Sequence, residues 1–120
     1  MRILIVDDSR AMRMIVKKTL RQAGFKDVTV EEASNGKEAL DMIEKSTPDL
    51  VLTDWAMPEM TGIELLEAIK EKGIRVKIGV VTSQGTPEMQ EAAKEAGALF
   101  LLTKPFTAET FEKVLAPVIQ

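Results

Sequence analysis

The chain has 120 residues, of which 45% are hydrophobic and 29% charged, a composition typical of one globular domain with its own core. It contains no cysteine, which excludes disulfides, and its N-terminal apolar run ends at Asp7, too early for a signal peptide or a membrane span. The formal net charge of −3 argues against nucleic-acid binding. We therefore expect a cytoplasmic protein that binds neither nucleic acid nor membranes.

The first part of the chain alternates strand-like and helix-like segments. Residues 2–6 form a continuous apolar run, and helical spacing of apolar residues follows over 12–23 until Gly24 ends it. Residues 28–33 alternate between apolar and polar side chains, as a half-buried strand does. Asn35 then has the position of an N-cap and predicts the start of a second helix.

The same rhythm continues through the middle of the chain. Residues 49–53 form a third apolar run, and Thr61 begins a helix with the spacing of a capping box. Residues 76–82 form a fourth run, after which Thr86 is followed by a proline, as an N-cap before the first helical position.

The last strand-helix unit completes an α/β pattern. Residues 98–102 form the fifth apolar run, and Thr107 begins a final helix whose end Pro117 is expected to fray. Five such units predict a doubly wound domain, in which helices cover both faces of a five-stranded parallel sheet. The runs without alternation are expected in the centre of that sheet, and the alternating run at 28–33 at an edge.

Polar side chains stand where the predicted strands end. In a sheet of this kind the loops after the strands gather on one side, and ligands bind there. The residues at these ends are Asp7 and Asp8 after the first run, Asp54 after the third, Thr82 and Ser83 after the fourth, and Lys104 after the fifth. Three carboxylates, a hydroxyl and an ammonium group are therefore expected to converge.

Such a cluster suits a metal-assisted reaction of phosphate. Three neighbouring carboxylates repel one another, and a hard divalent cation such as Mg²⁺ removes the repulsion. A metal and a lysine beside a carboxylate can hold the oxygens of a phosphoryl group in transfer. A carboxylate held in that position can itself attack the phosphorus and become an aspartyl phosphate.

Each of these residues also has an ordinary structural interpretation. Asp7 and Asp8 would cap a helix, Thr82 suits a strand, and Lys104 would lie on the surface with its stem along the sheet. Their coincidence at four strand ends favours a shared site instead. The stretch 9–26, which holds six Lys or Arg residues and no acidic residue, fits a solvated helix face and a docking face for an acidic partner equally well.

Four segments together resemble the receiver domain of two-component response regulators, over nearly the full length of the chain. They are ILIVDD at 3–8, DLVLTDWAMPEMTGIEL at 49–65, VVTS at 80–83 and GALFLLTKPF at 97–106. The first helix, in DDSRAMRMIV, is most similar to that of the single-domain, CheY-like chemotaxis regulators. The resemblance implies a flavodoxin-like (β/α)5 fold with strand order 2-1-3-4-5. It also implies a single receiver domain over residues 1–120, without an attached output domain.

The resemblance further implies roles in phosphoryl transfer. Asp54 would be the phosphoacceptor. Asp8 and Asp54 would bind Mg²⁺ directly and Asp7 through water, while the backbone carbonyl of Ala56 would complete the protein ligands. Lys104 would pair with the phosphoryl group.

The resemblance also implies a switch, from which the sequence departs at one position. Thr82 would be the switch hydroxyl, and the peptide bond before Pro105 would be cis. Leu101 stands where the family usually has an aromatic residue that moves between two positions. Phe100 is one residue away and should point to the other face of the sheet. Ser83 replaces a frequent alanine.

The resemblance implies a phosphorylation-driven signalling protein of a chemotaxis or other two-component system. A sensor histidine kinase, its phosphotransfer domain or a small acyl phosphate would phosphorylate Asp54. The face formed by the fourth helix, fifth strand and fifth helix would then bind an output protein, such as the flagellar motor switch. The domain would be a monomer. It would be no enzyme in the strict sense, since it would catalyse only its own phosphorylation and dephosphorylation.

Three other functions are alternatives to this one. A haloacid-dehalogenase-type phosphatase would need two aspartates spaced one apart on the first strand, whereas Asp7 and Asp8 are adjacent. A flavin binder would need a phosphate-binding loop where this chain has DDSRAM, which repels phosphate. A receiver-shaped adaptor that binds proteins without phosphorylation remains the alternative, because Leu101 removes the usual aromatic residue.

Overall fold

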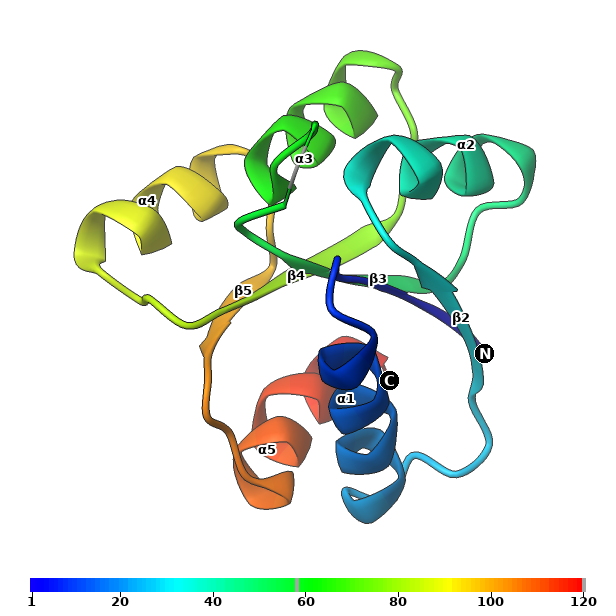
Figure 1. Cartoon of the computed structure of the whole chain (residues 1–120), viewed down its shortest axis with the longest axis vertical. Coiled ribbons are helices and arrows are strands. Elements are labelled where there is room, and N and C mark those ends of the chain that lie inside the picture. The colour runs from blue at the N-terminus through cyan, green and yellow to red at the C-terminus, as the bar shows by residue number, and fades with distance from the viewer. Residues whose placement is uncertain (58, 120) are drawn as a thin grey trace.

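The computed structural model describes residues 1–57 and 59–119, and within them the chain alternates five strands with five helices (Figure 1). The strands are β1 (Arg2–Val6), β2 (Thr29–Ala33), β3 (Leu50–Asp54), β4 (Lys77–Thr82) and β5 (Phe100–Thr103). The helices are α1 (Arg10–Gln22), α2 (Gly36–Lys45), α3 (Gly62–Glu71), α4 (Pro87–Glu95) and α5 (Ala108–Ile119). Pro58, within the segment 49–65, lies outside the described residues.

The strands form one parallel sheet in the order β2-β1-β3-β4-β5, which confirms the predicted fold class and strand order. In Figure 1, α2, α3 and α4 cover one face of the sheet, and α1 and α5 cover the other. Two separate groups of buried side chains fill the spaces between the sheet and these two helix layers. The connections are those of a doubly wound sheet, so all strand-to-helix loops meet at the carboxyl edge.

Side-chain caps mark where the five helices begin. The hydroxyl or amide oxygens of Ser9, Asn35, Thr61, Thr86 and Thr107 each accept a hydrogen bond from a backbone N–H in the first turn of the helix that follows. Thr61 also forms the complete capping box with Glu64. The predicted caps of α2, α3 and α4 are confirmed, since these short polar side chains satisfy donors that have no partner within the helix.

The last strand differs from its prediction in extent and in place. It begins at Phe100 rather than at residue 98, because the backbone N–H of Ala98 donates to Ala93 O at 2.9 Å and still belongs to the end of α4. It also lies at an edge of the sheet, although its sequence shows no alternation. The reason is that helices cover β5 on both faces: Leu101 packs on the α2–α4 side, and Phe100 and Leu102 pack on the α1 and α5 side.

The prediction that Pro117 frays the last helix is wrong. Helix α5 runs through Pro117 to Ile119. The proline ring is exposed, and Lys77 Nζ donates to the carbonyl of Val118 at 2.7 Å, which holds the last turn against β4. An exposed proline near the end of a helix removes only one backbone donor, so neighbouring contacts can preserve the turn.

A close backbone approach places the start of α3 directly against the end of β3. Gly62 N–H donates to Trp55 O at 2.8 Å, and a Cβ atom at Gly62 would collide with the backbone carbonyl of Asp54. A residue without a side chain is therefore required at this position. The contact fixes the backbone that directly follows Asp54.

None of the helices in residues 1–57 and 59–119 combines the length and the apolar character that a bilayer span requires.

Candidate functional site

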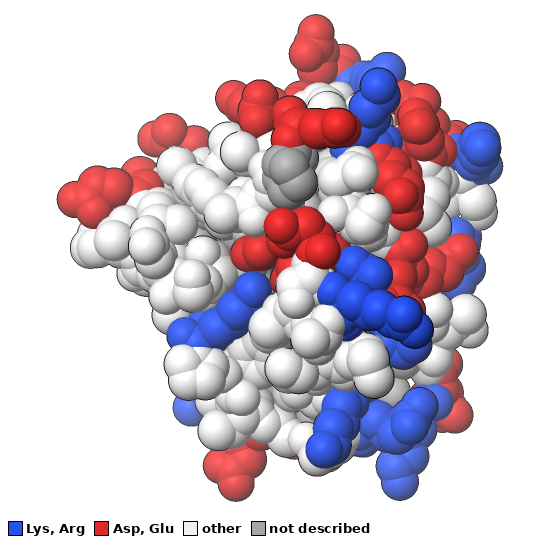
Figure 2. Space-filling model, viewed as in Figure 1, with Lys and Arg blue, Asp and Glu red and all other residues white. Residues whose placement is uncertain are grey.

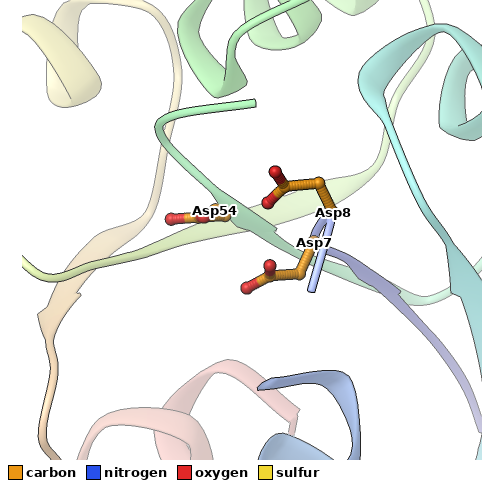
Figure 3. Close-up of side chains that lie close together, drawn as sticks. All are labelled: Asp7, Asp8 and Asp54. Atoms are coloured by element: carbon orange, nitrogen blue, oxygen red, sulfur yellow. The ribbon is translucent and has the colours of Figure 1, made fainter. Parts of the chain in front are cut away.

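Three aspartates meet at the carboxyl edge of the sheet, as predicted. Asp7 and Asp8 follow β1, and Asp54 is the last residue of β3, the neighbouring strand. Figure 3 shows their side chains gathered at the ends of these two strands. Each can offer a carboxylate oxygen that lies within 4.8 Å of the other two. In Figure 2 a group of acidic side chains lies near the middle of this face, with basic side chains on either side.

The three carboxylates differ in exposure. Asp7 is buried, Asp54 is partly buried, and Asp8 is exposed. The cluster is therefore open to solvent on the side of Asp8 and closed on the side of Asp7. Clustered carboxylate oxygens that are reachable from water suit a hard divalent cation, which takes oxygen ligands and keeps several of its waters.

Hydrogen bonds hold the Asp7 side chain on both of its oxygens. Ser9 N–H donates to Oδ1 at 2.9 Å, and Lys104 Nζ donates to Oδ2 at 3.4 Å. Ser9, rather than either aspartate, caps α1. The alternative in which Asp7 and Asp8 merely cap this helix is therefore wrong.

Lys104 lies between two of the carboxylates. Its Nζ is 3.4 Å from Asp7 Oδ2 and 3.5 Å from Asp54 Oδ1, and its side chain is 18% exposed. Its backbone N–H donates to Thr82 O at 2.7 Å, and its bond to Pro105 is cis, as predicted. The ammonium group thus points into the site, and the alternative of an exposed surface lysine is wrong.

Burial raises the pKa of the Asp54 carboxyl above its ordinary value of 3.8. The positive charge of Lys104 opposes this shift, while the negative charge of Asp7 adds to it. The N–H of Trp55 donates to Asp54 Oδ1 at 2.8 Å and also favours the ionised form. At neutral pH the ionised carboxylate is therefore less stable in the folded chain than it would be in water.

This shift predicts a pH-dependent stabilisation by Asp54→Asn in protein free of divalent metal. A carboxyl with a raised folded-state pKa loses stabilising free energy as the pH rises from its unfolded value through its folded one. Above that pH range the ionised Asp54 carboxylate lowers the free energy of unfolding of the wild type, whereas the neutral amide of Asp54→Asn does not. Asp54→Asn should therefore raise the melting temperature at pH 7 in EDTA. The difference should shrink toward zero well below pH 3.8, where the Asp54 carboxyl is protonated in both the folded and the unfolded chain. A lower melting temperature for the variant at pH 7 would contradict it.

The remaining predicted residues lie at or near the ends of β4 and β5. Thr82 is buried, and its Oγ1 accepts a hydrogen bond from Gln84 N–H at 3.2 Å. Ser83 is exposed in the loop that follows. Leu101 pairs with Val80, two residues before Thr82, so it lies back from the acidic cluster. Phe100 points to the opposite face, as predicted, where it covers Gly79.

Ala56, the predicted backbone ligand, is exposed in the loop two residues beyond Asp54. Sequence reasoning assigned no role to Arg13, which reaches from α1 to the backbone of Asp7. The sequence marks Arg13 only as one of several basic residues on a helix, and the contact depends on how α1 leaves β1.

Comparison with known proteins agrees with this arrangement. The family model of the response regulator receiver domain matches residues 3–116. Chemotaxis protein CheY-3 of Vibrio cholerae is 40% identical, and the match covers 100% of this chain and 92% of that protein. Chemotaxis protein CheY of Pseudomonas aeruginosa is 37% identical, with 100% and 97% covered.

A solved structure extends the likeness to three dimensions. Chemotaxis protein CheY4 of Vibrio cholerae, crystallised at pH 4.0, superposes with a TM-score of 0.85 and 37% sequence identity, covering 98% of this chain and 97% of that one. A match of sequence and fold over nearly every residue leaves little room for another family. The chain therefore belongs to the response regulator receiver domain family, a family of signalling proteins rather than classical enzymes, and its relatives include CheY chemotaxis proteins.

Proposed function

We propose that the chain is a phosphoacceptor switch in which Asp54 receives a phosphoryl group from a histidine kinase, its phosphotransfer domain or a small acyl phosphate. The observation that carries this proposal is the placement of the Asp54 carboxylate beside two further carboxylates and 3.5 Å from the Lys104 ammonium group. Asp54 is the member of the cluster that combines partial burial with contact to a cation, as an attacking group held in place requires.

The residues present fit a bound Mg²⁺ ion. Asp8 and Asp54 would hold it directly, Asp7 through water, and the carbonyl of Ala56 would be a further ligand. The donor set is all oxygen, and it carries more negative charge than Lys104 alone can neutralise. When bound, Mg²⁺ would neutralise the carboxylates and the negative charge of the phosphoryl oxygens.

In the transfer, an Asp54 carboxylate oxygen attacks phosphorus and forms an acyl phosphate. The bond from phosphorus to the donor breaks at the same time, and the leaving group is the histidine imidazole, which takes up a proton, or the carboxylate of the acyl donor. Lys104 binds a phosphoryl oxygen. Because Lys104 also pairs with Asp7 before transfer, its ammonium group would already lie near the phosphoryl position and need little reorganisation. Hydrolysis of the acyl phosphate would return the domain to its starting state.

The signal would leave the domain through Thr82 and the face of α4, β5 and α5. The Thr82 hydroxyl would turn from Gln84 N–H toward the phosphoryl group and draw the loop between β4 and α4 with it. A groove of about 640 Å³ lies on this face between α4 and β5, and Leu99, Leu101 and Lys94 are among its lining residues. We propose that an output protein of a chemotaxis system binds there, that the domain acts as a cytoplasmic monomer, and that it recognises protein rather than DNA.

One observation favours the alternative of an adaptor that needs no phosphorylation. Leu101 is partly buried against the cluster under α4, and an aliphatic side chain offers no hydroxyl or ring to report the state of Thr82. The two functions differ in a single measurement. Intact-mass spectrometry after incubation with acetyl phosphate and Mg²⁺ should detect a base-labile adduct for the switch. The adaptor would remain unmodified and would bind its partner equally well with and without the phosphoryl donor.

The metal site predicts that Mg²⁺ stabilises the fold. A ligand that binds only the native state at 100 times its dissociation constant adds about 2.7 kcal/mol to the free energy of unfolding. The melting temperature should therefore rise with Mg²⁺ concentration, and Asp8→Asn should remove most of the rise. Asp27→Asn, a matched change at an exposed aspartate before β2, should keep it. A melting temperature that excess Mg²⁺ does not move would contradict the site.

A further inference from the structure

Arg13 connects helix α1 to the loop that carries two of the aspartates. Its Nη1 donates to the backbone carbonyl of Asp7 at 2.7 Å, and its Nε donates to Glu32 Oε1 on β2 at 3.0 Å. The Arg13 side chain is only 14% exposed. A guanidinium held at two points in this way has a fixed position and direction.

The carbonyl that Arg13 holds belongs to the peptide group between Asp7 and Asp8. A peptide group is planar, so fixing the direction of this carbonyl also fixes the Cα atom of Asp8 relative to Asp7. The backbone N–H of Asp7 donates to Ala33 O at 3.1 Å, and both of its side-chain oxygens accept hydrogen bonds. Asp7 is thus fixed in position, and Arg13 adds the contact that also fixes the backbone between buried Asp7 and exposed Asp8.

Glu32 keeps the guanidinium in this orientation. Burial acts to raise the pKa of the Glu32 carboxyl, but the hydrogen bonds from Arg13 and Lys17 outweigh it and hold this pKa below its ordinary value. Glu32 is consequently ionised at neutral pH and accepts from Arg13 on one oxygen and from Lys17 on the other, at 3.3 Å. Lys17 and Arg13 therefore share the Glu32 carboxylate as an acceptor.

We propose that Arg13, oriented by Glu32, is a positioning residue for the metal site: it sets the Asp7–Asp8 peptide so that the Asp8 carboxylate faces the cation. The inference rests on the function proposed above. It concerns the affinity for the metal and leaves the identity of the phosphoacceptor unchanged. Arg13 acts through the backbone and would touch neither the cation nor the phosphoryl group.

The sign of the effect separates this role from a general effect of charge. Arg13 carries a positive charge close to a site for a cation, so an unspecific electrostatic role would make its removal tighten Mg²⁺ binding. Positioning makes the opposite prediction. If the carbonyl is released, the Asp8 carboxylate samples other directions, and ordering it again on binding weakens the affinity. Outer groups that orient metal ligands are worth about 10- to 100-fold in affinity.

The test is a Mg²⁺ titration of the full chain, followed by the fluorescence of Trp55, the only tryptophan. Arg13→Lys keeps the charge but offers a single nitrogen, and Arg13→Met removes the charge as well. Each should raise the dissociation constant about tenfold. Lys17→Met is the matched control, because it removes the same charge from the same helix and the same Glu32 carboxylate. It should leave the dissociation constant unchanged or lower it slightly.

A second readout needs no metal. In the Arg13 variants the Asp8 amide resonance should broaden or shift in metal-free protein, while in Lys17→Met it should stay as in the wild type. Circular dichroism melts should show that each variant is folded at the titration temperature. If Arg13→Met is not folded there, Arg13→Lys, the milder change, carries the comparison.

The outcomes distinguish the two proposals. If the wild type binds Mg²⁺ and Arg13→Lys binds it equally well, the positioning role is overturned and the proposed function stands. If Arg13→Met binds Mg²⁺ more tightly than the wild type, as Lys17→Met would, Arg13 acts only through its charge, and the positioning role is also overturned. If the wild type itself binds no Mg²⁺, the metal site falls and this inference falls with it.

Discussion

Asp54→Asn should abolish the phosphoryl adduct that forms with acetyl phosphate and Mg²⁺. The amide has no carboxylate oxygen with which to attack phosphorus, and Asp7, although it also contacts Lys104, is buried with both oxygens already engaged. Asp8 is exposed, and no contact with Lys104 is found for it within the described residues. The adduct signal in an intact-mass spectrum should therefore fall to background.

The matched control for this experiment lies at the other end of the same strand. Asp49 directly precedes β3, is exposed, and accepts a hydrogen bond from Arg2 N–H that an asparagine oxygen can still accept. Asp49→Asn should give the wild-type yield of adduct. Equal yield from Asp54→Asn would instead move the phosphoacceptor to another residue, and digestion of the adduct would identify it.

The sequence predicted most of the fold because local and global signals agree in it. Apolar runs of strand length alternate with segments of helical spacing, and short polar residues such as Asn35 and Thr61 mark where helices begin. These signals are local and can be read one segment at a time. The order of the strands is a different matter, since it depends on contacts between distant segments, and it followed from resemblance to a family.

Two of the corrections have a shared physical cause, which is tertiary contact. Leu101 and Leu102 are covered on opposite faces by two helix layers, so an edge strand carries the apolar pattern of a central one. Pro117 stays within a helix because Lys77, forty residues earlier, binds the next carbonyl. Neither contact can be predicted from the sequence around the residues concerned.

The candidate site was predictable to the same degree. Asp7, Asp8, Asp54 and Lys104 could be placed together because parallel strands end at one edge. What could not be predicted is how these groups are held. Arg13 reaches back six residues to a backbone carbonyl, and a basic residue on a helix gives no sign of such a contact.

Lys104→Met should separate binding of the anion from binding of the metal. The change keeps the length of the side chain and removes the ammonium group that lies 3.4 Å from Asp7 Oδ2 and 3.5 Å from Asp54 Oδ1. Loss of one preorganised donor to a developing or bound anion costs about a hundredfold. The rate of adduct formation, and the affinity for the phosphoryl mimic beryllofluoride read from Trp55 fluorescence, should fall by about that factor.

Mg²⁺ binding should respond to the same substitution in the opposite direction. Without the ammonium group, two carboxylates lose a neighbouring positive charge that competes with the cation, so the dissociation constant for Mg²⁺ should decrease. Lys113→Met, at an exposed lysine on α5, should change neither value. In the wild type, beryllofluoride should alter the fluorescence only when Mg²⁺ is present, because three carboxylates repel an anion that one lysine cannot hold. Binding of the mimic in EDTA, or equal binding by wild type and Lys104→Met, would show that the anion site is not built from Lys104 beside the acidic cluster.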